Sequence, residues 1–398
     1  MGLRNLMFLL GWLYVSAYAD GFQDYLEEQE TGKRAQQRQF ESFQEATRHD
    51  FESYKRALDK AYAAYTEAIA EVWEHPQFSD KKKWVTYSND KKTATAIAFD
   101  KQEIMIETIA ASKEEAMAKL KTALAKAVTE DTAQAQQSDP WMQQARAIAK
   151  SKLGIDAGEL HPEPLLSEAV FEKQPTPISV KAYVDAHIDM KKVAAVPSKV
   201  KGEKVYLVSV ALPSDTMQKR SKTFLGTVKE NAKRFELPVP LVFAIMHTES
   251  SFNPFARSRI PAYGLMQIVP ASAGEDAYLY LHKQHKRPSS SYLYNSANNI
   301  EMGSAYLHML YSSYLRKIEN PTSRLYCTIA AYNTGAGNVA YAWTGNHNIS
   351  EAAKQINRLS PDEVYRYLMD HLKYDEPKLY LDRVNRRMGI YDNMYGDV

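Results

Sequence analysis

Apolar positions recur at helical spacing through the first part of the chain. Between residues 33 and 75 the aromatic and aliphatic side chains follow one another in steps of three and four. This spacing predicts one long amphipathic helix, whose apolar stripe is a packing seam and which Pro76 ends. Four of its aromatic residues are spaced by eleven, which keeps the stripe nearly straight: Phe40, Phe51, Tyr62 and Trp73.

The spacing then changes to the alternation that is typical of β-strands. Three consecutive segments alternate, with a turn at Asn89-Asp90, and predict a small antiparallel meander. Residues 113–128 return to helical spacing, and residues 204–212 form one more predicted strand. Polar and proline-containing segments between them are expected to be irregular connections. We therefore expect residues 20–215 to form a mixed α+β domain with a long helix and a small antiparallel sheet. The alternating segments are 84–88, 93–99 and 104–109.

From Thr216 onward the pattern is helical. Asp215 predicts an N-cap for a helix that ends near Phe235. No strand pattern interrupts the later helices, so residues 216–398 are expected to form an all-α domain. The later predicted helices cover residues 241–249, 298–315, 361–372 and 376–388, with one more that begins at Pro321 and stops at the glycines of residues 335–337.

The predicted helix of residues 241–249 ends on a single carboxylate, Glu249, which two serines and Asn253-Pro254 follow. A carboxyl group at the end of a buried helix lies in a low dielectric, which favours its neutral form and raises its pKa. A neutral carboxylic acid near pH 7 is suited to general acid catalysis. By themselves, these residues leave open the alternative that a core helix stops in a polar turn and Glu249 only faces water.

Composition, charge and motifs exclude several classes of protein but do not specify a function. The hydrophobic content of 44% and charged content of 25% are ordinary for a soluble globular protein, and 398 residues suggest two or three domains. Residues 216–398 contain 22 Lys+Arg against 16 Asp+Glu, which suits a polyanionic partner, although imbalances of this size are common. The sequence contains no Gly-rich phosphate loop, zinc-ligand spacing or nucleic-acid motif. The single cysteine, Cys327, is expected to be a small buried hydrophobe.

The first residues have the pattern of a secretory signal. Arg4 precedes an apolar run at residues 6–15, and Ala17-Tyr18-Ala19 is a small-x-small cleavage site. We expect residues 1–19 to be a signal peptide that is cut after Ala19, and the protein to be exported to the periplasm. An uncleaved membrane anchor is the alternative, and no cysteine lies near this site to hold a lipid.

Four short patterns follow one another in the helical half. They are Glu-Ser-Ser-Phe-Asn-Pro at 249–254, Ala-Tyr-Gly-Leu-Met-Gln at 262–267, Asn-Asn-Ile at 298–300 with Gly303, Tyr306 and Leu307, and Ala-Ala-Tyr-Asn-Thr-Gly at 330–335. Each pattern alone is weak. In this order and with these separations, residues 224–387 resemble the catalytic domain of the family-1 lytic transglycosylases, which have the goose-type lysozyme fold.

The first half also resembles members of this family. Residues 84–110 are similar to the strands of the N-terminal domain in the membrane-bound C-type murein transglycosylases. Those proteins are lipoproteins, and this chain lacks the cysteine that lipid attachment needs. The long aromatic helix before Pro76 is a further departure from the pattern.

The resemblance implies a role for seven residues. Glu249 matches the single catalytic acid and base. Tyr263 occupies a position that is often small in relatives, which would alter the wall of the cleft. The resemblance implies no cofactor and no metal. The residues that match substrate-binding positions are Ser258, Met266, Gln267, Tyr332, Asn333 and Tyr380.

The resemblance further implies cleavage of the β-1,4 bond between MurNAc and GlcNAc in peptidoglycan. Glu249 would protonate the glycosidic oxygen and then accept the proton of the MurNAc C6 hydroxyl, which attacks C1 and leaves a 1,6-anhydro end. Most glycosidases use two carboxylates, and no second one is evident in the sequence. Two alternatives stay open: a lysozyme-like hydrolase of the same bond, and a non-catalytic peptidoglycan-binding module. The expected partners are glycan strands and, through the N-terminal domain, cell-envelope proteins, with no nucleic acid.

Overall fold

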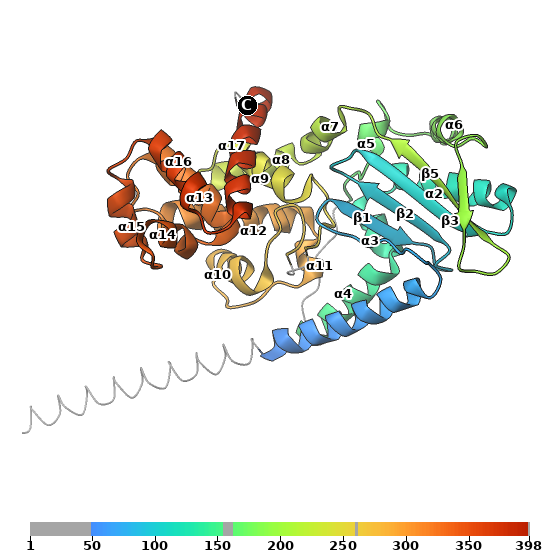
Figure 1. The fold of residues 1–398 in the computed structure, drawn as a ribbon, viewed down its shortest axis with the longest axis horizontal. Helices are drawn as coiled ribbons and strands as arrows, with labels where there is room; N and C mark the ends of the chain where they lie inside the picture. The colour runs from blue at the N-terminus through green and yellow to red at the C-terminus, as the bar shows by residue number, and fades with distance from the viewer. Residues whose placement is uncertain (1–48, 154–161, 259–261, 397–398) are drawn as a thin grey trace, which may run out of the picture. The chain divides into compact units, whose positions relative to one another are not determined.

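The computed structural model describes residues 49–153, 162–258 and 262–396. The chain divides into two compact units, Met1–Ser53 and Tyr54–Val398. Of the first unit only residues 49–53 are described, and they are helical. Apart from residues 49–53, the elements discussed below belong to the second unit, and Figure 1 labels most of them. The predicted signal peptide, and residues 33–48 of the predicted long helix, lie outside the described residues.

A helix covers residues 49–70, so the predicted long helix ends before Pro76 is reached. Trp73 still continues the predicted apolar stripe, because its N–H donates to the Ile69 carbonyl at 3.0 Å and both side chains lie in one buried cluster. Its ring lies 5.8 Å from that of Tyr87, and its Nε1 donates a hydrogen bond to the carbonyl of Lys91 at 2.6 Å. These contacts hold the end of the helix against the first hairpin.

The predicted meander is present and is part of a larger sheet. Strand β5 pairs with β3, and β4, which the sequence did not predict, adds to β5 at the edge; the order is β1-β2-β3-β5-β4, with every pair antiparallel. One face buries Ile97, Ile104 and Ile106, and the opposite face buries Ile69 and Trp73. The strands are β1 (Lys83–Tyr87), β2 (Thr93–Ala98), β3 (Glu103–Ala110), β4 (Ala194–Pro197) and β5 (Lys204–Ala211).

Helix α2 (Lys113–Thr129) confirms the predicted helix and packs against β3 and β2. Four further helices lie where irregular connections were expected, and that expectation was wrong. Two of them begin with reciprocal capping boxes, Asp131 with Gln134 and Thr176 with Ser179, so the missed signal was at their starts rather than in an apolar stripe. These helices are α3 (Thr132–Ser138), α4 (Pro140–Leu153), α5 (Ser167–Val170) and α6 (Pro177–His187).

The second half is helical, as predicted, but its first helix is interrupted. Helices α7 (Thr216–Thr223) and α8 (Leu225–Arg234) meet at Phe224, and Asp215 makes no side-chain cap hydrogen bond. The predictions of one continuous helix and of this cap were both wrong. At the junction, the buried ring of Phe224 stacks on that of Phe252, with centroids 6.2 Å apart.

The remaining elements agree with most of the predicted helices. Helices α12, α13, α16 and α17 correspond to predicted ones, whereas α14 and α15 were not predicted. The elements are α9 (Val239–Ser250), η1 (Pro270–Gly274), α10 (Glu275–His282), α11 (Ser290–Leu293), α12 (Ser296–Met309), η2 (Leu310–Tyr314), α13 (Pro321–Thr334), α14 (Ala336–Thr344), α15 (Ile349–Ile356), α16 (Pro361–His371) and α17 (Asp375–Tyr395).

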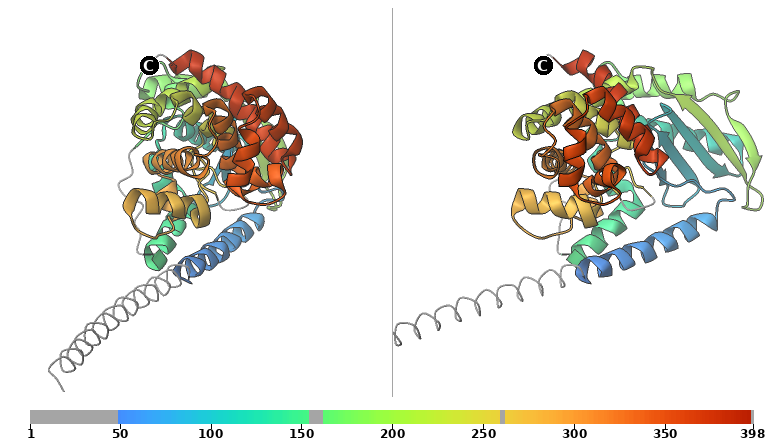
Figure 2. Two further views of the ribbon diagram at one scale, coloured as in Figure 1. Left: turned by 90° about the vertical axis from the view of Figure 1, so that its left-hand side faces the viewer. Right: turned by 60° about the vertical axis from the view of Figure 1, so that its left-hand side comes forward.

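Helix α9 packs against α17. In both views of Figure 2 the yellow-to-red helices of the second half lie close together. The ring of Phe243 lies 5.3 Å from that of Tyr391 and 4.9 Å from that of Tyr395. His247 Nδ1 lies 3.0 Å from the Tyr391 hydroxyl, and burial lowers the pKa of this histidine to about 3, as suits a structural role. Because later residues of α17 contact earlier residues of α9, the helices run antiparallel. The start of α17 therefore lies beside the end of α9.

The sheet and the helices share one hydrophobic core. The buried Arg220 donates hydrogen bonds to the carbonyl of Leu165 and, at 2.6 Å, to that of Phe252. The ring of Trp84, from β1, lies 5.0 Å from that of Phe255, which follows α9. The expected α+β architecture, with a helical second half, is confirmed.

Two single features complete the description. Cys327 is fully buried, as predicted, and burial raises the pKa of its thiol to about 12. None of the helices in the described ranges combines the length and apolar character that crossing a bilayer requires.

Candidate active site

The C-terminal end of α9 holds Glu249 in a fixed position. The helix ends because Ser251 takes a left-handed conformation, with φ of 53°, and Phe252 follows with φ of 62°. The hydroxyl of Ser250 donates to the carbonyls of Met246 at 3.0 Å and Leu265 at 2.8 Å. These bonds connect the last turn of the helix to the segment that contains the second sequence motif.

The carboxyl group of Glu249 is buried, with 6% of the residue exposed. Burial is the largest influence and raises its pKa above the ordinary value, as the sequence predicted. The ammonium of Lys81, 3.7 Å from Oε2, lowers this pKa, and so does the hydroxyl of Tyr380, whereas the carboxylate of Glu376 raises it. The net result is a carboxyl group that favours its neutral form more than a glutamate in water does.

Two tyrosines approach Glu249 from other helices. The buried hydroxyl of Tyr380, on α17, is close enough to lower the pKa of the acid, and it forms no hydrogen bond within the described ranges. The hydroxyl of Tyr332, on α13, donates to the carbonyl of Met266 at 2.8 Å. Burial, and next Glu249, raise the pKa of both tyrosines, so both hydroxyls stay neutral.

The turn of residues 262–267 is fixed by one asparagine. Asn299 Nδ2 donates to the carbonyls of Tyr263 and Leu293, both at 2.8 Å, while its Oδ1 accepts from the backbone N–H of Met266 at 2.7 Å. Gly264 has φ of 77°, and a Cβ at this position would lie 2.3 Å from both Asn299 Nδ2 and the Leu293 carbonyl. Glycine is therefore required here by conformation and by space.

The two predicted substrate-binding residues of this turn lie differently. The side chain of Met266 is fully buried, and a Cβ on Gly303 would meet its sulfur at 2.3 Å, so the thioether packs against α12. Gln267 has φ of 51°, and its Nε2 donates to the carbonyls of Ala256 at 3.2 Å and Gly264 at 3.1 Å. Its Oε1 is buried without a hydrogen-bond partner in the described part of the chain. A direct sugar contact by either side chain stays a prediction.

The other predicted residues lie at the rim of this group. Ser258 is bonded to Ala262, since its N–H donates to the Ala262 carbonyl at 3.1 Å and its Oγ accepts from the Ala262 N–H at 3.0 Å. Asn333 follows Tyr332 on α13 and is half-buried. Tyr263 is 4% exposed and packs edge-on against Tyr294, with centroids 5.6 Å apart, so it lies in the core rather than along an open cleft wall.

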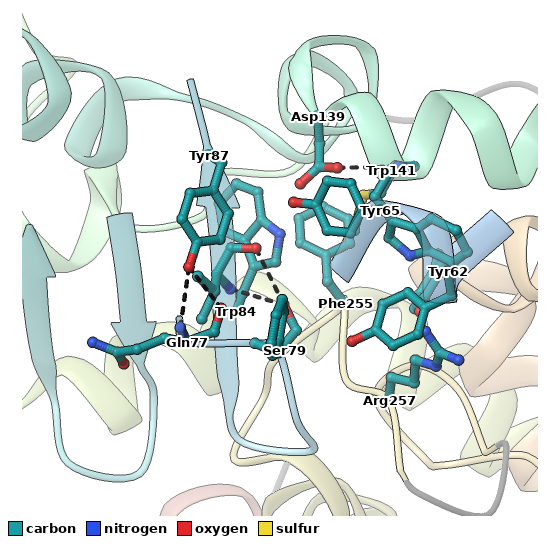
Figure 3. Close-up of a pocket in the computed structure, with 14 residues that line it drawn as sticks. Tyr62, Tyr65, Gln77, Ser79, Trp84, Tyr87, Asp139, Trp141, Phe255 and Arg257 are labelled. Atoms are coloured by element: carbon teal, nitrogen blue, oxygen red, sulfur yellow. Dashed lines mark hydrogen bonds between the residues drawn. The ribbon is translucent and has the colours of Figure 1, made fainter. Parts of the chain in front are cut away.

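An aromatic pocket borders the same loop (Figure 3). The guanidinium of Arg257, next to Ser258, lies 4.0 Å from the ring centroid of Tyr62 and 5.6 Å from that of Trp141. Its Nη1 is buried without a hydrogen-bond partner among the described residues, and the pocket has about 20 Å³ of free volume, enough for one water. The pocket therefore anchors the loop and is too small for a sugar.

Comparison with known proteins identifies both halves. Residues 51–223 match the family described as Membrane-bound lytic murein transglycosylase C, N-terminal domain, and residues 226–356 match the Transglycosylase SLT domain. The proteins named Membrane-bound lytic murein transglycosylase C from Salmonella typhimurium and Salmonella typhi are each 34% identical to this chain over 326 residues. This match covers 81% of the chain and 86% of each relative. The chain belongs to the membrane-bound lytic murein transglycosylase C family. It is thus an enzyme of the lytic transglycosylase class.

Solved structures of lytic transglycosylases are also similar to this family member. The 70 kDa soluble lytic transglycosylase SLT70 from Escherichia coli is 22% identical, with a TM-score of 0.34, and the match covers 46% of this chain and 28% of that one. The lytic transglycosylase Slt from Pseudomonas aeruginosa is likewise 22% identical, with a TM-score of 0.32 over the same shares. These scores are too low to add to the family assignment.

Two charged residues of this murein transglycosylase C member were missed from the sequence. Lys81 lies in a run of three lysines in the first half, and nothing in the local pattern connects it with α9. Glu376 lies four positions before Tyr380 on α17, and this spacing places both residues on one face of the helix. The second signal was available, because Tyr380 was itself a predicted site residue.

The described residues of the site offer no metal centre. No group of three or more His, Cys, Asp or Glu side chains that would suit a metal ion occurs within them. Around Glu249, the neighbours are an ammonium, two neutral hydroxyls and one further carboxylate. This set is suited to proton transfer and to hydrogen bonding of hydroxyl and acetamido groups.

Proposed function

We propose that this chain cleaves the MurNAc–GlcNAc β-1,4 bond of peptidoglycan as a lytic transglycosylase, and that Glu249 acts first as acid and then as base. The observation that supports this most directly is the buried, raised-pKa carboxyl at the end of α9. Membership of the lytic murein transglycosylase C family supports the substrate and the class of reaction.

In the first step, the neutral Glu249 donates its proton to the glycosidic oxygen as the bond from C1 breaks. The N-acetyl group of the substrate stabilises the positive charge that develops at C1. In the second step, the anionic Glu249 accepts the proton of the MurNAc C6 hydroxyl, whose oxygen forms the new bond to C1. The products are a free GlcNAc 4-hydroxyl and a 1,6-anhydro-MurNAc end, and no water is consumed.

The neutral groups around the acid bind and orient the sugars. Tyr332 and Asn333, adjacent on α13, and Gln267, in the glycine turn, present hydroxyl and amide groups to hydroxyl and acetamido groups of the glycan. Tyr380 donates to Glu249 once the acid has lost its proton, because its hydroxyl lies near the carboxyl and has no other described partner. Ser258 and Met266 hold the segments on either side of residues 259–261 in position.

One observation favours a second candidate, hydrolysis of the same bond. Glu376 is close enough to raise the pKa of Glu249, and it is exposed in the first turn of α17. A second carboxylate at a suitable distance activates water in inverting glycosidases. We retain the anhydro-forming reaction as the proposal, because a single acid accounts for the burial and the raised pKa of Glu249. A non-catalytic binding module has no support from the site, since it would not need a buried acid.

Digestion of purified sacculi by the full chain, followed by mass spectrometry of the muropeptides, separates these candidates. We expect 1,6-anhydro-MurNAc ends from the wild-type protein and none from Glu249→Gln. Glu376→Gln serves as the matched control on the neighbouring carboxylate, and we expect it to keep the anhydro product. Reducing-end MurNAc, lost in Glu376→Gln, would establish the hydrolase instead. Undiminished anhydro product from Glu249→Gln would refute the assignment of the acid.

We further propose that the enzyme acts in the periplasm, with residues 20–215 and 216–398 as its two domains after removal of residues 1–19. The pattern of the first nineteen residues and the cell-envelope location of the substrate support export. The relatives are named membrane-bound, which supports a place at the envelope. Mass spectrometry of the N-terminus of the exported protein tests this, since Asp20 is then expected to be its first residue.

A further inference from the structure

We propose that Lys81, from the segment that precedes β1, is a positioning residue of the active site, which orients the Glu249 carboxyl and controls its ionisation. This inference rests on the proposed function for its catalytic meaning. Lys81 Nζ lies 3.7 Å from Glu249 Oε2, while 39% of the lysine side chain and 8% of the glutamate side chain are exposed. Within the described ranges this contact comes from the first half of the chain, so the N-terminal domain would complete the site.

The backbone around Lys81 is attached to the loop that follows α9. Asn253 Nδ2 donates to the carbonyl of Lys81 at 3.4 Å, and the N–H of Arg257 donates to the carbonyl of Asp80 at 3.3 Å. The Asp80 carboxylate accepts from the N–H groups of residues 82 and 83, both at 2.8 Å, which fixes the local turn. The ammonium therefore extends toward Glu249 from a backbone held on both sides.

Side-chain packing strengthens this attachment. Trp84, three residues after Lys81, is 2% exposed, and its ring lies 5.0 Å from that of Phe255. Because Phe255 lies six residues after Glu249, this contact and the hydrogen bonds to residues 253 and 257 fix Lys81 relative to the acid over a short length of chain. A lysine held only by its flexible side chain would lose more entropy on pairing.

Among the described residues, the groups that face Glu249 come from three elements besides α9. Lys81 comes from the segment before β1, Tyr380 and Glu376 from α17, and Tyr332 from α13. Burial raises the pKa of Glu249, and among these groups the ammonium opposes that effect most strongly. A group that acts first as a general acid and then as a general base needs an intermediate pKa, close to the working pH. Without Lys81, Glu249 would stay protonated to higher pH, but as a weaker acid it would donate its first proton less readily.

Direct titration of Glu249 tests this contact without relying on turnover. The full chain is labelled with [δ-¹³C]glutamate, and the resonance that disappears in Glu249→Gln is assigned to Glu249. An opposite charge at this distance lowers a carboxyl pKa by roughly 1–3 units, and exposure of the lysine favours the lower end. In Lys81→Met we therefore expect the midpoint of this resonance to rise by about one pH unit. An unchanged midpoint would overturn the proposal.

Three variants make the result specific. Lys101→Met removes the same charge from an exposed position that lines the same groove as Lys81, and we expect no change in the Glu249 midpoint. Lys81→Arg keeps the charge and should restore most of the wild-type midpoint, and Lys81→Gln repeats the neutral change if the methionine variant folds poorly. An equal shift in Lys101→Met would attribute the effect to the general field and overturn a role for the contact.

The rate of anhydro-product formation from sacculi then tests the catalytic meaning. Since the first step needs protonated Glu249, the alkaline limb of the pH–rate profile should move to higher pH in Lys81→Met, with a lower maximum rate. A shifted resonance with an unmoved limb would refute the link to catalysis. Absence of anhydro product from the wild-type chain would refute the proposed function, while the titration would still decide whether Lys81 controls Glu249.

Discussion

Replacing the buried acid should stabilise the protein in a pH-dependent way. The folded-state pKa of Glu249 is raised above its value in the unfolded chain, chiefly by burial. For such a group, the contribution to stability is fully present below the unfolded pKa and is lost as pH rises through the folded pKa. Glu249→Gln removes this titration. The variant should therefore gain stability relative to the wild type as pH rises from about 4 to 8.

The size of the gain follows from the surroundings of the carboxyl. Each tenfold weakening of the acid on folding costs about 1.4 kcal/mol of stability at neutral pH. Burial to 6% exposure sets the penalty, and Lys81, itself 39% exposed, offsets part of it. The glutamine amide loses some of the gain, because it must be buried as well. We expect Glu249→Gln to be more stable by about 1–2 kcal/mol at pH 7.5.

Urea denaturation followed by circular dichroism, at several pH values, measures this difference. Glu230→Gln, at an exposed position on α8, controls for the removal of a carboxylate in general. A Glu249→Gln advantage that grows with pH supports a buried acid kept neutral by its site. A wild-type protein more stable than Glu249→Gln at pH 7.5, and equal to it at pH 4, would mean that the folded site prefers the anion, and would refute the reasoning.

Three further substitutions test the supports of the site. Tyr332→Phe removes the 2.8 Å bond to the Met266 carbonyl and should cost about 1 kcal/mol in urea denaturation, with at least a tenfold loss of anhydro-product formation. Gly303→Ala places a Cβ 2.9 Å from the Cβ of Met266 and also against its sulfur. The overpacking should cost about 1–3 kcal/mol, whereas the gain in helix propensity is roughly 1 kcal/mol. The melting temperature should therefore fall. Arg220→Met leaves the Phe252 carbonyl and a second buried carbonyl unpaired and should cost at least about 3 kcal/mol by the same denaturation, with Lys222→Met on the exposed side of α7 as its control.

Local patterns were sufficient for the elements that build the site. The alternating segments became β1 to β3, and the apolar run before Glu249 became α9, because both depend on neighbours in the sequence. The raised pKa of Glu249 was also predictable, since an apolar helix that ends on one carboxylate buries it. The fold class and the family followed from the order of four short motifs.

Long-range packing accounts for what was missed. The burial of Met266 depends on Gly303, 37 positions away, whose missing side chain creates the space in which the thioether lies. The break at Phe224 depends on a contact with Phe252, and no local signal marks it. Lys81 is 168 positions from Glu249, so only the three-dimensional fold connects the two charges.

The proposed boundary at residue 216 is crossed by buried contacts, so it does not divide the packing of the chain. Arg220, just after it, is buried between a carbonyl of the first half and the carbonyl of Phe252. Arg257 is attached through its backbone to Asp80 and through its guanidinium to the ring of Tyr62, so the loop that contains Ser258 is held from two sides by the first half. Because the acid, its ammonium and this loop share one set of contacts, displacement of the N-terminal domain would alter both the ionisation of the acid and the loop beside it.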